Sequence, residues 1–557
     1  MERVWHKFYQ EGVPPAIDYP DITIPKFLEN TVKKYPDNIA LTFFGKKINY
    51  RKFYESVNRF AAALSDLGIK KGDKFSILLP NCPQFVIAYF AANKIGVINV
   101  NTNPLYVERE LIYQLNDSGS ETILCLDLLY PRVKKVKEKT NLKTIIVTSI
   151  KDYLPFPLNL LYPIKQKREG HVVKIDKEPG VYLFKDLLNK YPPSPPEVET
   201  SPEEIALLQY TGGTTGISKG CILTHKNLVA NTLQCESWFV EAIEGKETCL
   251  CALPFFHVFG MTVAMLYSVR DGYNMILMPK FEVESALKSI KKHKPTIFPG
   301  VPAMYAAINY HPDVEKYDLS SIKYCISGAA PLPVEICKKF EELTGAKLVE
   351  GYGLTETSPV THCNPFVGLR KIGSIGVPFP DTDAKIMDIE TGENEMLLGE
   401  SGELAIFGPQ VMKGYWNKPE ETKNVLREGW CYTGDIAKID DDGFFYIVDR
   451  KKDMIISGGF NIYPREVEEV LYEHPKVREA AVIGVPDTKY GESVKAFISV
   501  KEGEELTEEE IIQFCKENLA KYKIPRSVEF RDEMPKSLVG KVLKRVLVEE
   551  ELKKIDK

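Results

Sequence analysis

Several features that mark whole classes of protein are scarce in this 557-residue chain. Its 72 lysines and arginines are outnumbered by 77 acidic residues, and the net charge of -5 gives no support to a nucleic-acid partner. No apolar run reaches the roughly 18 residues that a membrane-spanning helix needs, and the first residues lack the apolar core of a signal peptide. These absences predict a cytoplasmic protein without a transmembrane segment.

Paired cysteines are also missing. The eleven cysteines are scattered, and only Cys249 and Cys251 lie close together. No two-residue-spaced pairs with nearby histidines suggest a zinc site. The pattern predicts reduced, buried thiols.

Length and residue order predict two domains. At 557 residues the chain is too long for one core, and its 44% hydrophobic content is ordinary for a folded protein. Short apolar runs such as "KFSILLP" from Lys74 alternate with helix-length segments such as "PQFVIAYFAANKIG" from Pro83. This alternation predicts an α/β fold, with a large N-terminal domain of mostly parallel sheets covered by helices. From Asp453 the segments are shorter and more charged, which predicts a small α+β C-terminal domain.

Two helices of the small domain are indicated by their first residues. Thr507 and Glu510 have the spacing of a capping box ahead of "EEEIIQFCKENLA". Pro464 stands where a first helical turn would begin, before "REVEEVLYEH".

The segment from Tyr210 to Gly220, "YTGGTTGISKG", has the composition of an anion-binding loop. Glycines let backbone N–H groups turn toward an anion, threonine hydroxyls donate hydrogen bonds, and Lys219 adds a positive charge. A Walker A loop needs Gly-Lys-Ser/Thr, whereas Lys219 here follows Ser218 and precedes glycine, so an ordinary P-loop kinase or GTPase is disfavoured. A glycine-rich turn between a strand and a helix stays an equal alternative.

Three further stretches carry side chains suited to ATP chemistry. "GYGLTET" places Thr355 beside Glu356, and a carboxylate near a triphosphate is a natural Mg²⁺ ligand. "YTGD" ends in Asp435, which is suited to holding two ribose hydroxyls, and "PKSLVGKVLKR" carries Lys541. Taken singly, a helix cap, a turn aspartate and a surface lysine explain these residues at least as well.

Seven motifs in a fixed order make a stronger pattern than any of them alone. They are "YTGGTTGISKG", "LPFFH", "SGAAPL", "EGYGLTET", "YTGD", "VDRKKDMIISGGFNIYP" and "PKSLVGK". Over roughly residues 25 to 550 the chain resembles the adenylate-forming superfamily of acyl- and aryl-CoA synthetases, luciferases and peptide-synthetase adenylation domains. Within it the chain is most similar to long-chain fatty acid–CoA ligases. Ser218 departs from the proline of most relatives, although a small residue there also fits the fatty-acyl branch, and residues 127–202 resemble the family least.

The resemblance implies an AMP-forming acid–thiol ligase. A carboxylic acid attacks the α-phosphate of ATP, pyrophosphate leaves, and the CoA thiol then displaces AMP from the acyl-adenylate. Medium or long-chain fatty acids are the implied substrates, and Mg²⁺ is the implied cofactor. The implied ATP- and AMP-binding residues are Thr211, Gly212, Gly213, Thr214, Thr215, Gly216, Lys219, Gly328, Ala329, Ala330, Gly351, Tyr352, Gly353, Thr355, Asp435 and Arg450.

The resemblance also implies catalytic roles for three side chains. Lys541 would bridge the acyl carboxylate and the α-phosphate oxygens, Thr355 would contact the α-phosphate, and Glu356 would bind Mg²⁺. Tyr352 would stack on the adenine, and Asp435 would hold the ribose with help from an arginine.

A rotation of the small domain is implied as well, because one site must serve two unlike half-reactions. Lys452 matches the hinge position of the family, so the expected parts are an ATP- and acyl-binding domain over 1–449, a hinge over 450–452 and a mobile lid domain over 453–557. The implied CoA-binding residues are Gly458, Gly459 and Phe460. A plain hairpin turn at "SGG" is the alternative.

The motif "LPFFH" and its neighbours are the implied acyl pocket. Its residues are Phe255, Phe256, His257, Phe259, Gly260 and Met261. Aromatic side chains there suit an apolar acyl tail, and Gly260 would leave room for it.

Other functions stay open at this point. An amino-acid adenylation module is disfavoured because phenylalanines stand where such modules have an aspartate. A luciferase-like oxygenase, an enzyme for an aryl or short-chain acid, and a catalytically silent binding homologue are the remaining alternatives. The sequence also leaves open whether the protein is a monomer or a homodimer, and whether 154–164 makes peripheral membrane contact.

Overall fold

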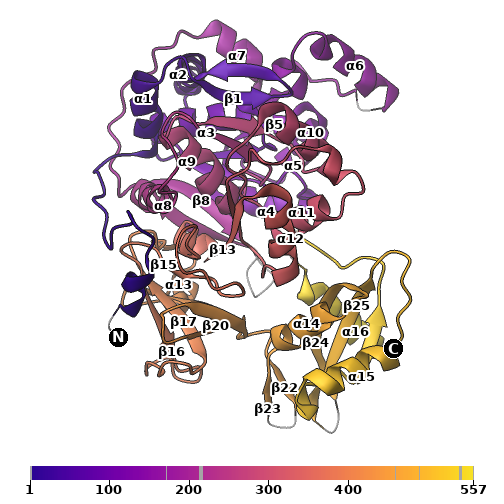
Figure 1. Ribbon diagram of the computed structural model, residues 1–557. Coiled ribbons are helices and arrows are strands. Elements are labelled where there is room, and N and C mark those ends of the chain that lie inside the picture. The colour runs from indigo at the N-terminus through magenta and orange to yellow at the C-terminus, as the bar shows by residue number, and fades with distance from the viewer. Residues whose placement is uncertain are drawn as a thin grey trace.

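The computed structural model describes residues 3–170, 172–211, 218–457, 460–487, 490–537 and 542–555. Its large N-terminal part and its smaller C-terminal part are seen in Figure 1, the latter in yellow. The α/β class predicted from the alternation of strands and helices is confirmed.

An eight-stranded sheet forms one layer of the large part. Six of its strands, from β8 to β7, are parallel, whereas β9 and β18 are antiparallel additions at one edge. In spatial order the strands are β18 (Gly414–Tyr415), β9 (Lys219–Thr224), β8 (Ile205–Thr211), β4 (Ile98–Asn101), β3 (Lys74–Leu78), β5 (Thr122–Leu126), β6 (Thr144–Thr148) and β7 (Val181–Leu183).

A second layer consists of two four-stranded sheets that Ile297 links, since it bridges Cys249 of one and Tyr324 of the other. The first contains β10 (Thr248–Cys251), β11 (Asn274–Leu277), β1 (Ile39–Phe43) and β2 (Lys46–Asn49). The second contains β12 (Tyr324–Ser327), β13 (Lys347–Gly353), β14 (Val360–Cys363) and β15 (Val377–Pro378).

Helices cover these sheets. The predicted helix from Pro83 is α3 (Pro83–Lys94). Every side chain from Pro83 to Asn93 is buried, so the helix is enclosed on all faces. A helix with apolar side chains all round needs such an enclosed place. The other helices of the large part are α1 (Ile24–Lys34), α2 (Tyr50–Asp66), α4 (Glu108–Ser118), α5 (Tyr130–Lys137), α6 (Leu158–Arg168), α7 (Phe184–Lys190), α8 (His225–Trp238), α9 (Tyr267–Arg270), α10 (Val283–His293), α11 (Pro302–Asn309), α12 (Val334–Thr344) and α13 (Pro419–Val425).

A fourth sheet lies below the large body in Figure 1, beside the C-terminal part. All of its pairings are antiparallel, which the alternation of strands and helices did not predict. Its strands are β16 (Asp383–Met387), β17 (Gly402–Phe407), β20 (Trp430–Ile439), β19 (Leu426–Arg427) and β21 (Phe445–Arg450).

The C-terminal part has a core of its own, built from side chains between Ile455 and Cys515, whereas the main core runs from Trp5 to Phe445. The predicted helices are confirmed: α14 (Pro464–Glu473) begins at the proline, and Thr507 caps α15 (Glu508–Asn518) by accepting a hydrogen bond from the Glu510 amide. The remaining elements are β22 (Ile455–Ser457), β23 (Phe460–Ile462), β24 (Val477–Asp487), β25 (Gly491–Val500), β26 (Ser527–Phe530) and α16 (Lys544–Ile555).

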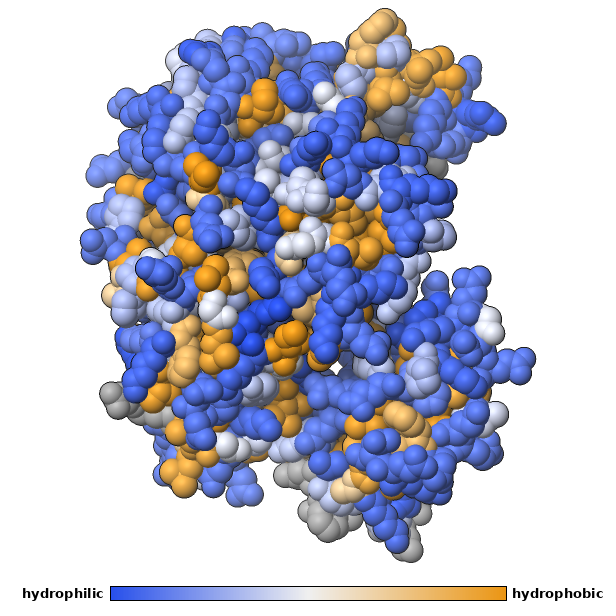
Figure 2. Space-filling view, in the orientation of Figure 1, coloured by the Kyte–Doolittle hydropathy of each residue, from blue (hydrophilic) through white to orange (hydrophobic). Residues whose placement is uncertain are grey.

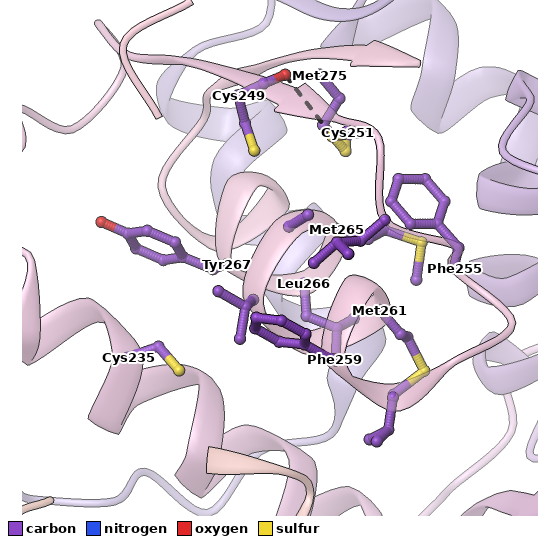
Figure 3. Packing of buried hydrophobic residues seen from close by; sticks show 14 of the residues in the cluster. Cys235, Cys249, Cys251, Phe255, Phe259, Met261, Met265, Leu266, Tyr267 and Met275 are labelled. Atoms are coloured by element: carbon purple, nitrogen blue, oxygen red, sulfur yellow. Dashed lines mark hydrogen bonds between the residues drawn. The ribbon is translucent and has the colours of Figure 1, made fainter. Parts of the chain in front are cut away.

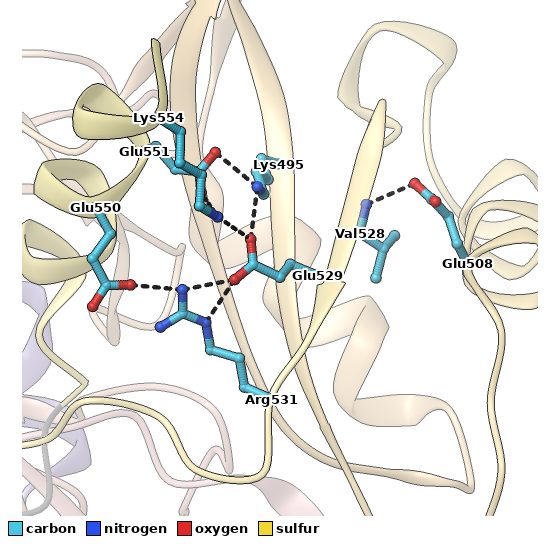
Figure 4. Close-up of polar contacts among 8 residues, drawn as sticks. All are labelled: Lys495, Glu508, Val528, Glu529, Arg531, Glu550, Glu551 and Lys554. Atoms are coloured by element: carbon cyan, nitrogen blue, oxygen red, sulfur yellow. Dashed lines mark hydrogen bonds and ion pairs between the residues drawn. The ribbon is translucent and has the colours of Figure 1, made fainter. Parts of the chain in front are cut away.

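An ionic cluster ties the last helix to the C-terminal sheet (Figure 4). Glu529 accepts hydrogen bonds from Lys495 at 2.9 Å, Lys554 at 2.8 Å and Arg531 at 2.7 Å. Burial favours the neutral acid, but these cations more than offset it and lower the pKa of Glu529 to about 2. The carboxylate therefore stays ionised and holds β25, β26 and α16 together.

Candidate nucleotide-binding site

Asp435 is the best-enclosed carboxylate among the predicted site residues, with 4% of its surface exposed. The antiparallel pairing of β20 with β21 places it opposite Arg450, whose Nε lies 3.2 Å from Oδ1. The hydroxyl of Tyr352, at the end of β13, donates a 2.6 Å hydrogen bond to Oδ2. Three residues that are far apart in sequence, all predicted to contact AMP, therefore meet at one carboxylate.

The protonation states of this group follow from burial and charge. Burial and the negative charge of Asp435 raise the pKa of the Tyr352 phenol well above its ordinary value, so the hydroxyl remains a donor. Burial opposes the charged form of Arg450, but Asp435 and Asp453 more than offset this and raise the pKa of the guanidinium.

A buried glutamate fixes the turn that precedes Asp435. Glu403 of β17 accepts a hydrogen bond from the Gly434 amide at 3.1 Å and another from Lys451 Nζ at 2.9 Å. The Thr433 hydroxyl accepts from the amide of Asp435 at 3.1 Å. The motif "YTGD" and the middle residue of the predicted hinge are thus held by one side chain, Glu403, which the motifs did not single out.

Glu356 and the loop lysine lie on either side of a tyrosine. The hydroxyl of Tyr415, in β18, donates a 2.6 Å hydrogen bond to Glu356 Oε1. The Nζ of Lys219 lies 5.0 Å from the centroid of the same ring, within cation–π range. Because β18 pairs with β9, the end of the predicted phosphate loop comes next to the predicted Mg²⁺ ligand. Sequence motifs gave no signal for Tyr415.

Lys219 also has an acidic partner. Its Nζ lies 2.6 Å from Glu421 Oε2 of α13, and its side chain is only 11% exposed. A polyphosphate bound at this lysine would compete with Glu421 for the same positive charge.

Most of the predicted phosphate loop, 212–217, lies outside the described residues, as do Gly458, Gly459 and Lys541. The two ends of the loop are tied together, because the Ser218 hydroxyl donates to the Thr211 carbonyl at 2.9 Å. Ser457 pairs with Phe460 across the antiparallel strands β22 and β23, which agrees with the hairpin alternative at "SGG" and leaves the CoA prediction untested.

The predicted adenine wall is closely packed. A Cβ on Gly328 would lie 3.0 Å from the Phe259 ring, and one on Gly353 would lie 1.9 Å from the Pro359 carbonyl oxygen. Ala329 has a left-handed backbone with φ of +65°, which is uncommon for a residue with a side chain. The ring of Phe259 therefore joins the predicted acyl pocket to the predicted nucleotide wall.

The predicted acyl-pocket residues do not all share one environment. Phe255 and Met261 are fully buried in the main core (Figure 3). Phe256 and His257 are half-buried. Residues Gly260–Leu266 form a π-helix, a conformation often found at functional sites. A Cβ on Gly260 would lie 2.4 Å from the Pro254 carbonyl oxygen, so backbone packing is sufficient to require this glycine, without an acyl tail.

The predicted hinge is a tight turn after β21. The amides of Asp453 and Met454 both donate to the Arg450 carbonyl, at 3.0 and 3.1 Å. Asp449, one residue earlier, accepts a 2.7 Å hydrogen bond from the Arg465 amide in the first turn of α14. Lys452 therefore lies within the turn that connects the last strand of the large part to the small one.

Comparisons with known proteins identify the family. The family model described as "AMP-binding enzyme" matches residues 28–416, and "AMP-binding enzyme C-terminal domain" matches 466–541. The chain belongs to the AMP-binding enzyme family. It is 50% identical over 555 residues to a long-chain-fatty-acid–CoA ligase of Bacillus subtilis (strain 168), covering 99% of this chain and 98% of the relative.

Solved AMP-binding enzymes have the same fold. An anthranilate CoA ligase in complex with anthranoyl-AMP superimposes with a TM-score of 0.86 at 26% identity, covering 96% of this chain and 98% of that one. ATP-bound MatB from Rhodopseudomonas palustris superimposes with a TM-score of 0.83 at 29% identity, covering 95% of this chain and 99% of that one. Both chains are matched almost end to end, so the likeness includes the small C-terminal part.

Proposed function

We propose that the protein is an ATP-dependent acyl-CoA synthetase for medium or long-chain fatty acids. Near full-length similarity to a long-chain-fatty-acid–CoA ligase supports the substrate class. The observation that carries the chemistry is the meeting of Tyr352, Arg450 and Asp435 at one end of the site, with Lys219 and Glu356 joined by Tyr415 at the other.

In the first half-reaction an oxygen of the fatty-acid carboxylate attacks the α-phosphorus, and the bond to pyrophosphate breaks. Lys219 neutralises the leaving pyrophosphate, and Lys541 bridges the carboxylate and the α-phosphate oxygens. Asp435 holds the ribose, with Arg450 fixing its position. Such positioning and charge neutralisation are the main contributions a protein makes to this type of transfer.

Glu356 fits the role of a Mg²⁺ ligand. Tyr415 occupies Oε1, and the carboxylate is only half-buried. The described part of the chain contains no cluster of three or more histidine, cysteine, aspartate or glutamate side chains that would hold a metal alone. Mg²⁺ suits such a site, since it is commonly bound by one or two carboxylates together with substrate phosphates, whose charge it neutralises.

In the second half-reaction the CoA thiol attacks the acyl carbonyl, its proton is lost, and the bond from the carbonyl to AMP breaks. We place a hinge at 450–452, on which 453–557 rotates relative to 1–449 so that Lys541 withdraws and Gly459 approaches. The separate cores on either side of this turn support two bodies.

Half-reaction assays test this proposal. Lys541→Ala should lose adenylate formation yet still convert supplied acyl-AMP to acyl-CoA, whereas Gly459→Leu should do the reverse. Loss of the same half-reaction in both variants would refute the rotation. Pyrophosphate release should be greatest with medium or long-chain acids; a maximum with aromatic or short-chain acids would refute the substrate class, and light emission with luciferin would favour an oxygenase.

A further inference from the structure

Helix α6 presents its apolar side chains to solvent. Leu160 is 61% exposed, Leu161 is 52% exposed and Ile164 is 64% exposed. Phe156, just before the helix, is 79% exposed. Figure 2 shows this group as an orange projection on one corner of the molecule, where Figure 1 places α6. Exposed apolar patches of this kind mark contact surfaces.

The opposite face of α6 contacts the protein through side chains with polar groups. Tyr162 packs against the main core, and Gln166 is buried with its amide directed at Asp127 Oδ2, 3.5 Å away. A surface helix ordinarily turns its apolar stripe inward. In α6 this order is inverted: Leu160 and Ile164, one turn apart, face solvent and are not part of the main core.

The charges beside the stripe are predominantly positive. Helix α6 ends in Lys165, Lys167 and Arg168, and the sequence from Leu158 to Arg168 contains no acidic residue. Glu169 follows the helix and lies 3.8 Å from Lys165 Nζ, so the three cations exceed the neighbouring acidic charge by two. The chain as a whole carries a net charge of -5, so this cluster departs from the rest of the molecule. Apolar side chains next to lysine and arginine are the composition of helices that lie in the surface of an anionic bilayer.

We propose that α6 docks the protein on an anionic phospholipid surface, with Leu160, Leu161 and Ile164 entering the acyl boundary and the three cations contacting headgroup phosphates. Eleven residues give a helix of roughly 16 Å, about half of the roughly 30 Å hydrocarbon core, so α6 lies along the surface. No helix within the described ranges is long and apolar enough to cross a membrane.

Size and charge favour lipid over a second copy of the chain. A helix about 16 Å long and about 10 Å wide has a footprint on the order of 160 Å². A stable protein interface buries about 800 Å² on each partner, and lysine is depleted from such interfaces. An anionic bilayer needs no matching surface and attracts each of the cations.

Vesicle flotation tests the proposal with the full-length protein. The wild type should bind vesicles containing phosphatidylglycerol and bind those of phosphatidylcholine alone much more weakly. Leu160→Gln/Ile164→Gln should reduce binding about tenfold or more. The matched control is Ile243→Gln/Leu397→Gln, whose side chains are 59% and 72% exposed elsewhere, and it should bind like the wild type. Lys165→Gln/Lys167→Gln should reduce binding about tenfold to thirtyfold at low salt, whereas Lys280→Gln/Lys316→Gln should not.

A labelled cysteine gives a second reading that does not depend on deleting a side chain. All eleven natural cysteines are buried, so Leu160→Cys can be labelled selectively with an environment-sensitive dye, with Leu397→Cys as the control. The dye at 160 should shift to the blue with phosphatidylglycerol vesicles, and the dye at 397 should not.

Three outcomes would overturn the proposal. The first is absence of vesicle binding by the wild type, and the second is equal binding by the α6 variants and their controls. The third is a dye at position 160 whose emission does not shift when phosphatidylglycerol vesicles are added. If Leu160→Gln/Ile164→Gln instead converts a dimer to a monomer in light scattering, the helix binds a second copy and the lipid assignment is wrong. These readouts do not involve catalysis, so they stand apart from the proposed synthetase activity.

Discussion

Tyr352 donates its phenolic hydrogen to Asp435 across 83 positions of sequence, at 2.6 Å. The bond joins the end of β13 to β20, and Arg450 holds the second carboxylate oxygen from the neighbouring strand. Tyr352 and Arg450 therefore fix the orientation of the Asp435 carboxylate, which we propose binds the ribose.

Removal of this bond should weaken nucleotide binding. Tyr352→Phe keeps the ring and deletes only the hydroxyl, and hydrogen bonds to charged groups contribute about 1.5–3 kcal/mol. We expect KM for ATP to rise about tenfold or more, with a smaller change in kcat. Tyr432→Phe is the control. Tyr432 lies on the same strand as Asp435, but its hydroxyl donates to the Gly392 carbonyl at 2.9 Å and not to Asp435. An unchanged KM for ATP in Tyr352→Phe would contradict the assigned role of Asp435.

Tyr415 should control the response to Mg²⁺. Burial and the charge of Glu356 raise the pKa of the Tyr415 phenol, so it donates at every working pH. Tyr415→Phe frees Glu356, and loss of a residue that orients a metal ligand typically costs about 10- to 100-fold in metal affinity or activity. A Mg²⁺ titration of pyrophosphate release should show a shift of this size.

The control for Tyr415 is Tyr446→Phe, because Tyr446 donates a comparable 3.1 Å bond to Asp440. An equal Mg²⁺ response in both variants would count against Glu356 as the metal ligand.

The buried carboxyl group of Glu350 should lower the free energy of unfolding as pH rises. It is 6% exposed, and Oε2 has no hydrogen-bond partner among the described residues. Burial raises its pKa from 4.5 to about 7, and Arg465 only partly opposes this. Between these values the unfolded chain ionises while the folded protein stays neutral, so the free energy of unfolding falls as pH rises through that window, by up to about 3 kcal/mol.

Glu350→Gln should therefore be more stable than the wild type at pH 8 by about 1–3 kcal/mol and nearly equal to it at pH 4. Urea unfolding at both pH values measures this difference. Glu342→Gln, at an exposed position of α12, should change neither value. If the free energy of unfolding of Glu350→Gln changed with pH as it does in the wild type, groups other than Glu350 would be responsible for that change.

Gly328→Ala should reduce binding of AMP. The new methyl group would press on the Phe259 ring at 3.0 Å, and overpacking of this kind costs about 1–3 kcal/mol. Calorimetry should show AMP affinity reduced about fivefold or more, and the midpoint of unfolding should fall because the overpacking destabilises the folded state. Gly484→Ala is the control, because its new methyl group would be similarly crowded in β24, 3.0 Å from Glu492 Oε1 and 3.2 Å from Ile455 Cγ1. Equal AMP affinity in the two variants would show that Gly328 does not contact the adenine.

Local patterns in the sequence were enough to predict the elements and the fold class. Pro464 and Thr507 begin their helices because proline at a first turn and a threonine cap act within a few residues. The run of apolar residues in α3 predicted a helix, and its burial on all sides follows from the same residues. The motif order predicted the family, which the comparisons show.

Only the tertiary structure decided which side chains meet. The antiparallel sheet of β16 to β21, on which Asp435 and Arg450 face each other, depends on pairings across many positions of sequence. Tyr415, Glu421 and Glu403 are ordinary residues in the sequence, and they enter the site because strand pairing brings them to Glu356, Lys219 and Gly434. The outward stripe of α6 has the same origin, since Tyr162 and Gln166 occupy the inner face and leave Leu160 and Ile164 in water.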